Sequence, residues 1–201
     1  MKVNLLIPAR ECEAELVVKK SRFIARLVPV QDRGQVNAAV ARARLDYPDA
    51  RHHCWAYLLG RPADATGAGM SDDGEPAGTA GKPILNVLQH GELGNVLVIV
   101  VRYFGGIKLG AAGLVRAYAN ATRQVLDITP AQRLTHWHCY LLCGDFSLEQ
   151  PLRHLLSGLQ GKLSQIDYGV GIEVQLQLAA DDVIPVRNFC AAHGAELKAV
   201  D

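Results

Sequence analysis

The sequence predicts an α+β protein of two domains. The chain has 201 residues, more than the roughly 100–150 that are typical of one domain. Strand-like and helix-like patterns alternate in both halves, and the pattern restarts after Pro130. With 49% hydrophobic and 20% charged residues, the composition is that of an ordered globular chain. We therefore expect one domain at residues 1–130 and a second at 131–201.

The first domain is expected to hold four strands and three helices. Strands are predicted at 11–18, 23–30, 52–59 and 95–103. Helices are predicted at 32–47, 83–90 and 109–127. The strand at 95–103 is apolar on both faces, which is typical of a central strand. Residues 61–82 are rich in Gly, Ala, Asp and Pro, and their composition predicts a long loop, which is commonly functional or mobile.

The second domain shows a β-α-β-β-α-β order. Its elements are predicted at 137–143, 147–159, two strands meeting near Tyr168 and Gly169, 181–193 and 196–200. Ser147 and Asp181 are expected to cap its helices, and Gly194 to end the second helix. This order predicts the split, ferredoxin-like arrangement.

The composition excludes several classes of protein. The longest unbroken apolar run, 96–101, is far shorter than the roughly 20 residues that span a bilayer, and the N-terminal segment lacks a signal-peptide pattern. We expect a cytoplasmic protein that does not bind membranes. The five scattered cysteines lack CxxC spacing and indicate neither a disulfide framework nor a zinc site: Cys12, Cys54, Cys139, Cys143 and Cys190.

Charge divides the two halves. Residues 1–130 hold 16 Lys and Arg against 12 Asp and Glu, a net charge of +4, whereas residues 131–201 hold 5 against 8, a net charge of −3. Any attraction for a polyanion is therefore expected in the first domain.

The segment VVRYFGGIKLGAAGLVRAY, residues 100–118, joins a strand to a helix through a Gly-rich loop. Such a loop can present backbone N–H groups to a phosphate. A Walker A site is excluded, because Ala111 and Ala112 stand where Lys and Ser or Thr are required. The candidate anion-binding residues are Arg102, Gly105, Gly106, Lys108, Gly110, Gly113, Arg116 and Arg123. Alternatively, the glycines only permit close packing or positive φ angles.

Asp72, Asp73 and Glu75 form an acidic loop that allows three interpretations. The carboxylates have the oxygen ligands that a divalent metal prefers. The favoured interpretation is a solvated turn, because Asp and Gly stabilise turns locally. In the third, the loop folds against Arg102, Lys108 or Arg116, which would place it beside the 105–113 loop.

His52, His53 and Cys54 raise the possibility of a thiol nucleophile or a metal site. On a strand, His52 and Cys54 share one face while His53 lies on the other, so the three side chains cannot converge. A core role is favoured for Cys54. No catalytic residue, metal ligand or cofactor is predicted.

The motifs ARHHCWAY at 50–57, SDDGEPAGTAGKP at 71–83 and the 100–118 segment resemble the IMPACT family, and the length resembles its two-domain bacterial members. Ala112 departs from a loop that is often richer in glycine. The resemblance implies a first domain similar to domain 2 of ribosomal protein S5 and a second similar to ferredoxin-like domains of elongation factor G. Eukaryotic members regulate translation by interfering with activation of an initiation-factor kinase, so the resemblance implies a connection to translation.

Three functions follow as hypotheses. The first is a non-enzymatic regulatory protein that contacts RNA, the ribosome or a phosphate-bearing ligand through its basic, Gly-rich surface. The second is a phosphate-handling enzyme, which would need the acidic loop to supply a base and hold Mg²⁺. The third is a module that binds only a protein partner in translation control. The sequence leaves the oligomeric state open.

Overall fold

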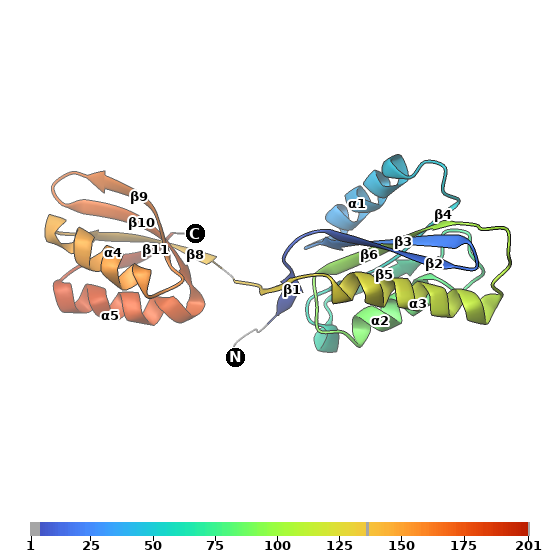
Figure 1. Ribbon diagram of the computed structural model, residues 1–201. Helices are drawn as coiled ribbons and strands as arrows, with labels where there is room; N and C mark the ends of the chain where they lie inside the picture. The colour runs from blue at the N-terminus through green and yellow to red at the C-terminus, as the bar shows by residue number, and fades with distance from the viewer. Residues whose placement is uncertain (1–4, 136, 201) are drawn as a thin grey trace. The chain divides into compact units, whose positions relative to one another are not determined.

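The computed structural model describes residues 5–135 and 137–200 of an α+β protein (Figure 1). The chain forms two compact units, Met1–Leu134 and Thr135–Asp201. The division falls after Leu134 and not after residue 130, because strand β7 (Ala131–Arg133) pairs antiparallel with β1 (Leu6–Pro8). Within the described residues, no helix combines the length and the apolar character needed to cross a membrane.

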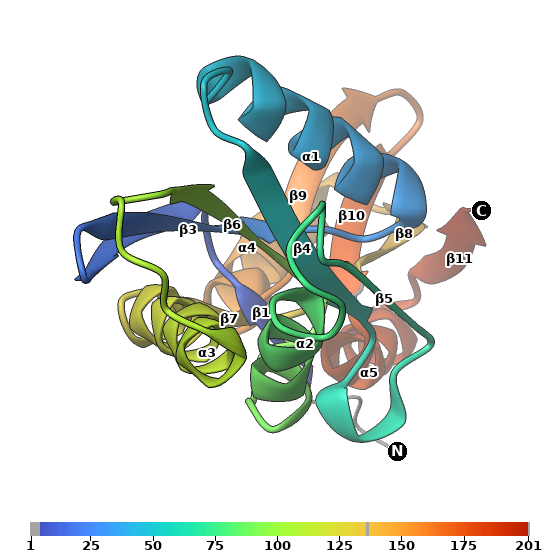
Figure 2. The ribbon, with the colours of Figure 1, turned by 90° about the vertical axis from the view of Figure 1, so that its right-hand side faces the viewer.

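The first unit contains a five-stranded antiparallel sheet with the order β2-β3-β6-β4-β5. Its strands are β2 (Cys12–Val18), β3 (Ser21–Pro29), β4 (His52–Leu59), β5 (Gly67–Ser71) and β6 (Val96–Tyr103). Its helices are α1 (Arg33–Asp46), α2 (Gly81–Gln89) and α3 (Ala111–Asp127), with a short 3₁₀ turn, η1 (Pro62–Asp64). Helix α1 covers one face of the sheet, and α2 and α3 cover the other (Figure 2).

Most boundaries of the first unit lie close to those predicted. Asp32 caps α1 by accepting a 2.9 Å hydrogen bond from the Gln35 N–H. Strand β6 occupies the centre of the sheet, and all of its residues except Tyr103 are buried, as its apolar sequence predicts.

Strand β5 corrects the prediction that 61–82 is entirely loop. It pairs with β4 at the sheet edge, with Trp55 opposite Ser71 and Tyr57 opposite Gly69. A Cβ atom at Gly69 would lie 2.6 Å from the Tyr57 ring, so glycine lets the two strands pair here. The pairing depends on a partner distant in the sequence, and the Gly-rich segment itself has no strand-like pattern.

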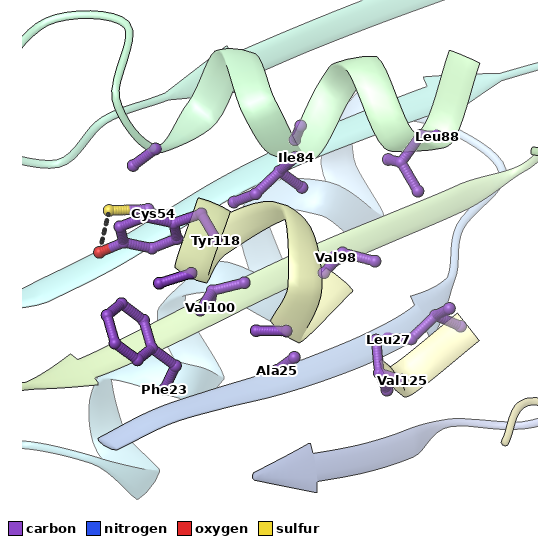
Figure 3. Close-up of a cluster of buried hydrophobic side chains, with 14 of the residues drawn as sticks. Phe23, Ala25, Leu27, Cys54, Ile84, Leu88, Val98, Val100, Tyr118 and Val125 are labelled. Carbon is purple, nitrogen blue, oxygen red and sulfur yellow. Dashed lines mark hydrogen bonds between the residues drawn. The ribbon is translucent and has the colours of Figure 1, made fainter. Parts of the chain in front are cut away.

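Two hydrophobic clusters hold the sheet between its helices. The cluster beneath α2 and α3 includes Phe23, Cys54, Ile84 and Tyr118 (Figure 3). The Phe23 and Tyr118 rings meet edge to face, with centroids 5.2 Å apart. The cluster beneath α1 is built from the alternate residues of the same strands, as strand geometry requires.

The second unit is a four-stranded antiparallel sheet with the order β11-β8-β10-β9. Its strands are β8 (Trp137–Gly144), β9 (Lys162–Tyr168), β10 (Ile172–Ala179) and β11 (Glu196–Val200). Its helices are α4 (Glu149–Ser157) and α5 (Val183–His193), each preceded by a 3₁₀ turn, η2 (Phe146–Leu148) and η3 (Ala180–Asp182). The N-terminal part of each predicted helix is therefore 3₁₀. Gly194 ends α5 in the left-handed conformation, as predicted.

Candidate functional site

Asp72 anchors the acidic loop to the start of α2. Its carboxylate accepts hydrogen bonds from the N–H groups of Gly78, Ala80 and Gly81 at 2.8, 3.0 and 2.8 Å. Burial opposes ionisation of Asp72, but these three donors outweigh it and hold its pKa below the usual value. The Asp72 side chain therefore closes the loop and occupies the N-terminus of α2.

Asp73 ties the same loop to the start of β4 and to α1. It adopts a left-handed backbone conformation with φ of 42°. Its carboxylate accepts from the His53 N–H at 2.7 Å and from the Arg44 guanidinium at 2.6 Å. Its carbonyl oxygen lies 2.9 Å from Nδ1 of His52. Two elements thus hold this residue in place.

Glu75 forms a buried ion pair with Arg102. The Arg102 Nη1 donates to Glu75 Oε1 at 2.5 Å, and the two side chains are 8% and 3% exposed. Tyr118 of α3 donates to the same carboxylate oxygen at 2.8 Å. Two of the predicted site residues therefore meet, which bears out the hypothesis that the acidic loop folds against Arg102.

The Cys54 thiol completes this buried polar group. Its Sγ lies 3.0 Å from the Asp72 carbonyl oxygen. The same Sγ lies 3.3 Å from the Tyr118 hydroxyl, and Figure 3 marks this second contact with a dashed line. Burial raises the pKa of Cys54 to about 12, and burial together with the neighbouring Cys54 raises that of Tyr118. His52 and Cys54 lie on the α3 side of the sheet and His53 on the α1 side, as predicted. A neutral, buried thiol is a core group and not a nucleophile.

The Gly-rich loop packs on the turn between β2 and β3. A Cβ atom at Gly105 would lie 2.0 Å from the backbone of Lys20, so only glycine permits this approach. Gly110 begins α3 with φ of 71°, and among the described residues no side chain caps that helix. Gly106 also has a positive φ, of 85°, while a Cβ atom at Gly113 would lie 3.1 Å from the Leu109 side chain. The packing and positive-φ roles of the glycines are therefore present, and they leave the first N–H groups of α3 uncapped.

A pocket of about 340 Å³ lies where the acidic loop meets the Gly-rich loop. Glu75 and Pro76 line it from the acidic loop, and Lys108, Gly110 and Ala111 line it from the Gly-rich loop and the start of α3. The two loops therefore lie side by side, as expected.

The pocket gathers some of the predicted anion-binding residues and leaves others out. Arg102, Lys108 and Gly110 line it, together with Arg51 and His52 at the start of β4. Arg51 was not among the residues predicted for this site. The register that places His52 opposite Arg102 brings it there, and register cannot be inferred from the sequence alone.

Arg116 and Arg123 lie on the exposed face of α3, outside this pocket. Arg123 donates to Asn120 at 3.1 Å and lines a separate pocket of about 650 Å³ near the C-terminal ends of α2 and α3. The polar helix face predicted for them is present, but neither side chain lines the pocket at the Gly-rich loop.

Within residues 5–135 and 137–200, no group of three or more His, Cys, Asp or Glu side chains is arranged to hold a metal ion. The carboxylates of Asp72, Asp73 and Glu75 accept hydrogen bonds from backbone N–H groups, Arg44, Arg102 and Tyr118. The loop is neither a cluster of metal ligands nor a solvated turn, because its acidic side chains bond to the rest of the first unit.

The fold and the site define a two-unit α+β protein with a Gly-rich loop and a helix N-terminus beside a buried Arg–Glu pair. Residues 19–126 match the Impact N-terminal domain. The chain belongs to the IMPACT family.

Named relatives support this assignment. The chain is 40% identical over 178 residues to the Escherichia coli IMPACT family member YigZ. This match covers 89% of this chain and 87% of that protein. It is 47% identical over 127 residues to a Haemophilus influenzae IMPACT family member, a match that spans 63% of this chain and 62% of that relative. A crystal structure described as a hypothetical protein has 35% identity and a TM-score of 0.69, covering 100% of this chain and 99% of the other. This chain is therefore a YigZ-like member of the family.

Proposed function

We propose that the protein is a non-enzymatic regulatory protein of translation that contacts RNA, in the ribosome or free, through the basic surface around the Gly-rich loop. Membership of the IMPACT family supports a translation-related regulatory role in broad terms. The basic surface comprises Lys19, Lys20, Lys108 and Arg116.

The main support for the proposal is that the cations of this surface are exposed and form no ion pair with a described residue. Lys108 and Arg116 are exposed and form no ion pair with any described residue. Lys19 and Lys20, also exposed, form the turn between β2 and β3 against which Gly105 packs. Unpaired cations on one side of a domain attract a phosphate backbone with little dependence on base sequence.

Several other arginines of the first unit are engaged by acidic side chains. Arg26 bonds to Glu13 and Asp46, and Arg42 bonds to Glu11. Lys19, Lys20, Lys108 and Arg116 are therefore among the cations of the first unit that no described acidic side chain neutralises. The second half carries a net charge of −3 and would repel a polyanion.

The acidic loop does not favour the enzyme hypothesis. A phosphate-transfer enzyme needs carboxylates free to hold Mg²⁺ or to act as a base. The Asp72 carboxylate accepts hydrogen bonds from three backbone N–H groups, and the Glu75 carboxylate accepts from Arg102 and Tyr118. Neither carboxylate is therefore free for that role.

The proposal extends to the fold and location of the protein. We infer that residues 1–130, extended to Leu134 by β7, form a domain similar to domain 2 of ribosomal protein S5. The β-α-β-β-α-β order and the strand order β11-β8-β10-β9 support a ferredoxin-like second domain. A translation partner implies a cytoplasmic protein.

Co-sedimentation with 70S ribosomes and with ribosome-free RNA across a salt series tests the function. The wild type should pellet with at least one of them at low salt and dissociate as salt rises. Lys108→Ala with Arg116→Ala should weaken the association about tenfold or more. Arg61→Ala is the control. It removes one exposed cation, paired with Asp64, that follows the C-terminal end of β4, whereas the pocket at the Gly-rich loop lies at the N-terminal end of that strand. Association that is insensitive to salt and to the double variant would favour a purely protein-binding module.

A further inference from the structure

The Arg102 side chain carries a buried hydrogen-bond donor without a partner. Its Nη1 bonds Glu75, but its Nε is buried and has no acceptor among the described residues. The residue as a whole is 7% exposed, and it lines the pocket of about 340 Å³. Buried N–H groups nearly always have a partner, so this donor points to an acceptor supplied from outside the chain.

The surroundings of Arg102 favour an anion as that acceptor. The N-terminus of α3, a helix of 17 residues, opens into the same pocket without a side-chain cap. Arg51 and Lys108 line the pocket and form no ion pair with a described residue. Because Arg102 already neutralises Glu75, these two cations and the helix dipole leave a net positive site.

The remaining walls of the pocket are apolar. Phe104, Leu109 and Leu114 line it, and Phe104 is 56% exposed at its edge. The guanidinium of Arg102 lies 5.7 Å from the Phe104 ring centroid. An exposed ring beside a phosphate-sized anion site offers a surface on which a nucleobase can stack. The pocket volume falls in the range of small-ligand sites, roughly 300–1,000 Å³.

We propose that this pocket binds a nucleotide with a terminal phosphate monoester, its phosphate at the start of α3 with Arg51 and Lys108 and accepting from the Arg102 Nε, and its base on Phe104. Two sources share this chemistry: a free nucleoside monophosphate and the 5′-phosphorylated end of an RNA strand. The inference rests on the proposed function in placing an anion at the Gly-rich loop, but it names a discrete ligand and does not require ribosome binding.

Calorimetric titration of the full chain tests the inference. The probes are adenosine and uridine 5′-monophosphates, the corresponding nucleosides, inorganic phosphate, and a five-nucleotide RNA with either a 5′-phosphate or a 5′-hydroxyl. The nucleotides are expected to bind at least tenfold more tightly than the nucleosides. If RNA ends are the source, the 5′-phosphorylated RNA will bind more tightly than the free nucleotides. If free nucleotides are the source, they will bind at least as tightly as that RNA.

Variants separate the two parts of the site. Phe104→Ala should weaken nucleotide binding about tenfold and leave the binding of inorganic phosphate unchanged, whereas Lys108→Ala should weaken both. Arg61→Ala should weaken neither. Nucleotides that bind no better than nucleosides, or a Phe104→Ala variant with wild-type nucleotide affinity, would overturn the inference. Salt-dependent RNA binding, combined with no preference for nucleotides over nucleosides or for a 5′-phosphate on RNA, would overturn the inference and leave the proposed function intact. Nucleotide binding without RNA or ribosome association would support the inference and overturn the proposed function.

Discussion

The Arg102 guanidinium donates a 2.5 Å hydrogen bond to Glu75 in a pair that is almost completely buried. This contact joins the central strand β6 to the acidic loop, and the Tyr118 hydroxyl adds α3 to it. The pair therefore fixes the relative positions of the three segments that surround the small pocket of the first unit.

Glu75→Gln is expected to destabilise the protein by about 3–5 kcal/mol, because it leaves the charge of Arg102 buried without its partner. Tyr118→Phe removes only one neutral donor and should cost less, about 1–2 kcal/mol. Urea unfolding of both variants measures the two values. Equal, small losses would show that the ion pair does not hold the loop.

Asp72→Ala should lower the free energy of unfolding on the order of 3 kcal/mol, because three backbone N–H groups lose their common acceptor. Asp72→Asn is the matched variant, since an amide oxygen in place of Oδ1 still accepts from Ala80 and Gly81. The asparagine variant should retain more than half of the stability that Asp72→Ala loses. Thermal unfolding at pH 7 compares the two, and an alanine variant as stable as the wild type would refute the anchoring role.

The pKa of His53 is lowered by burial, and the nearby charge of Arg44 adds to this, while Asp73 opposes it. The unfolded chain therefore binds the proton more readily than the folded chain does. As the pH falls below about 6.5, the ordinary pKa of histidine, the free energy of unfolding should decrease by at most about 1.4 kcal/mol per pH unit from this group. Denaturant titrations between pH 5 and 8 should show a shallower decrease in His53→Gln but not in His154→Gln, whose side chain is exposed. Identical profiles for all three proteins would contradict this assignment.

Cys54 should not react with iodoacetamide at pH 8 in the folded protein, because its side chain is fully buried and its pKa is raised to about 12. Cys139 is exposed and serves as the internal control. Mass spectrometry of labelled peptides should find Cys139 modified at once and Cys54 only after denaturation. Labelling of Cys54 at the rate of Cys139 would restore the thiol-enzyme hypothesis.

Most of the regular elements could be predicted from periodicity because they bury a face that their own sequence specifies. The strand 52–59 and the strand 196–200 have the predicted bounds, and Asp32 caps α1 at the first position of the helix predicted at 32–47. Strand β5 could not be predicted, since its hydrogen bonds depend on β4 and its apolar side chains, Ala68 and Met70, are exposed. The short strands β1 and β7, which pair with each other, were also not predicted.

The site could be predicted only in part, because contacts between segments distant in the sequence bring its residues together. Opposite charge suggested that the acidic loop meets Arg102, but the choice of Glu75 as its partner depends on how Asp72 folds the loop onto α2. Arg51 reaches the pocket through the pairing of β4 with β6. Lys108 was identified because it lies in the loop itself.

The salt dependence of RNA affinity tests the central claim, that the surface around the Gly-rich loop binds a phosphate backbone. Fluorescence anisotropy with a labelled single-stranded RNA should give an association constant that falls linearly with salt on logarithmic axes. Lys108→Ala with Arg116→Ala should reduce the magnitude of that slope by about one to two units, whereas Arg61→Ala should leave it unchanged. A double variant with the slope of the wild type, or no measurable RNA binding at low salt, would contradict the claim.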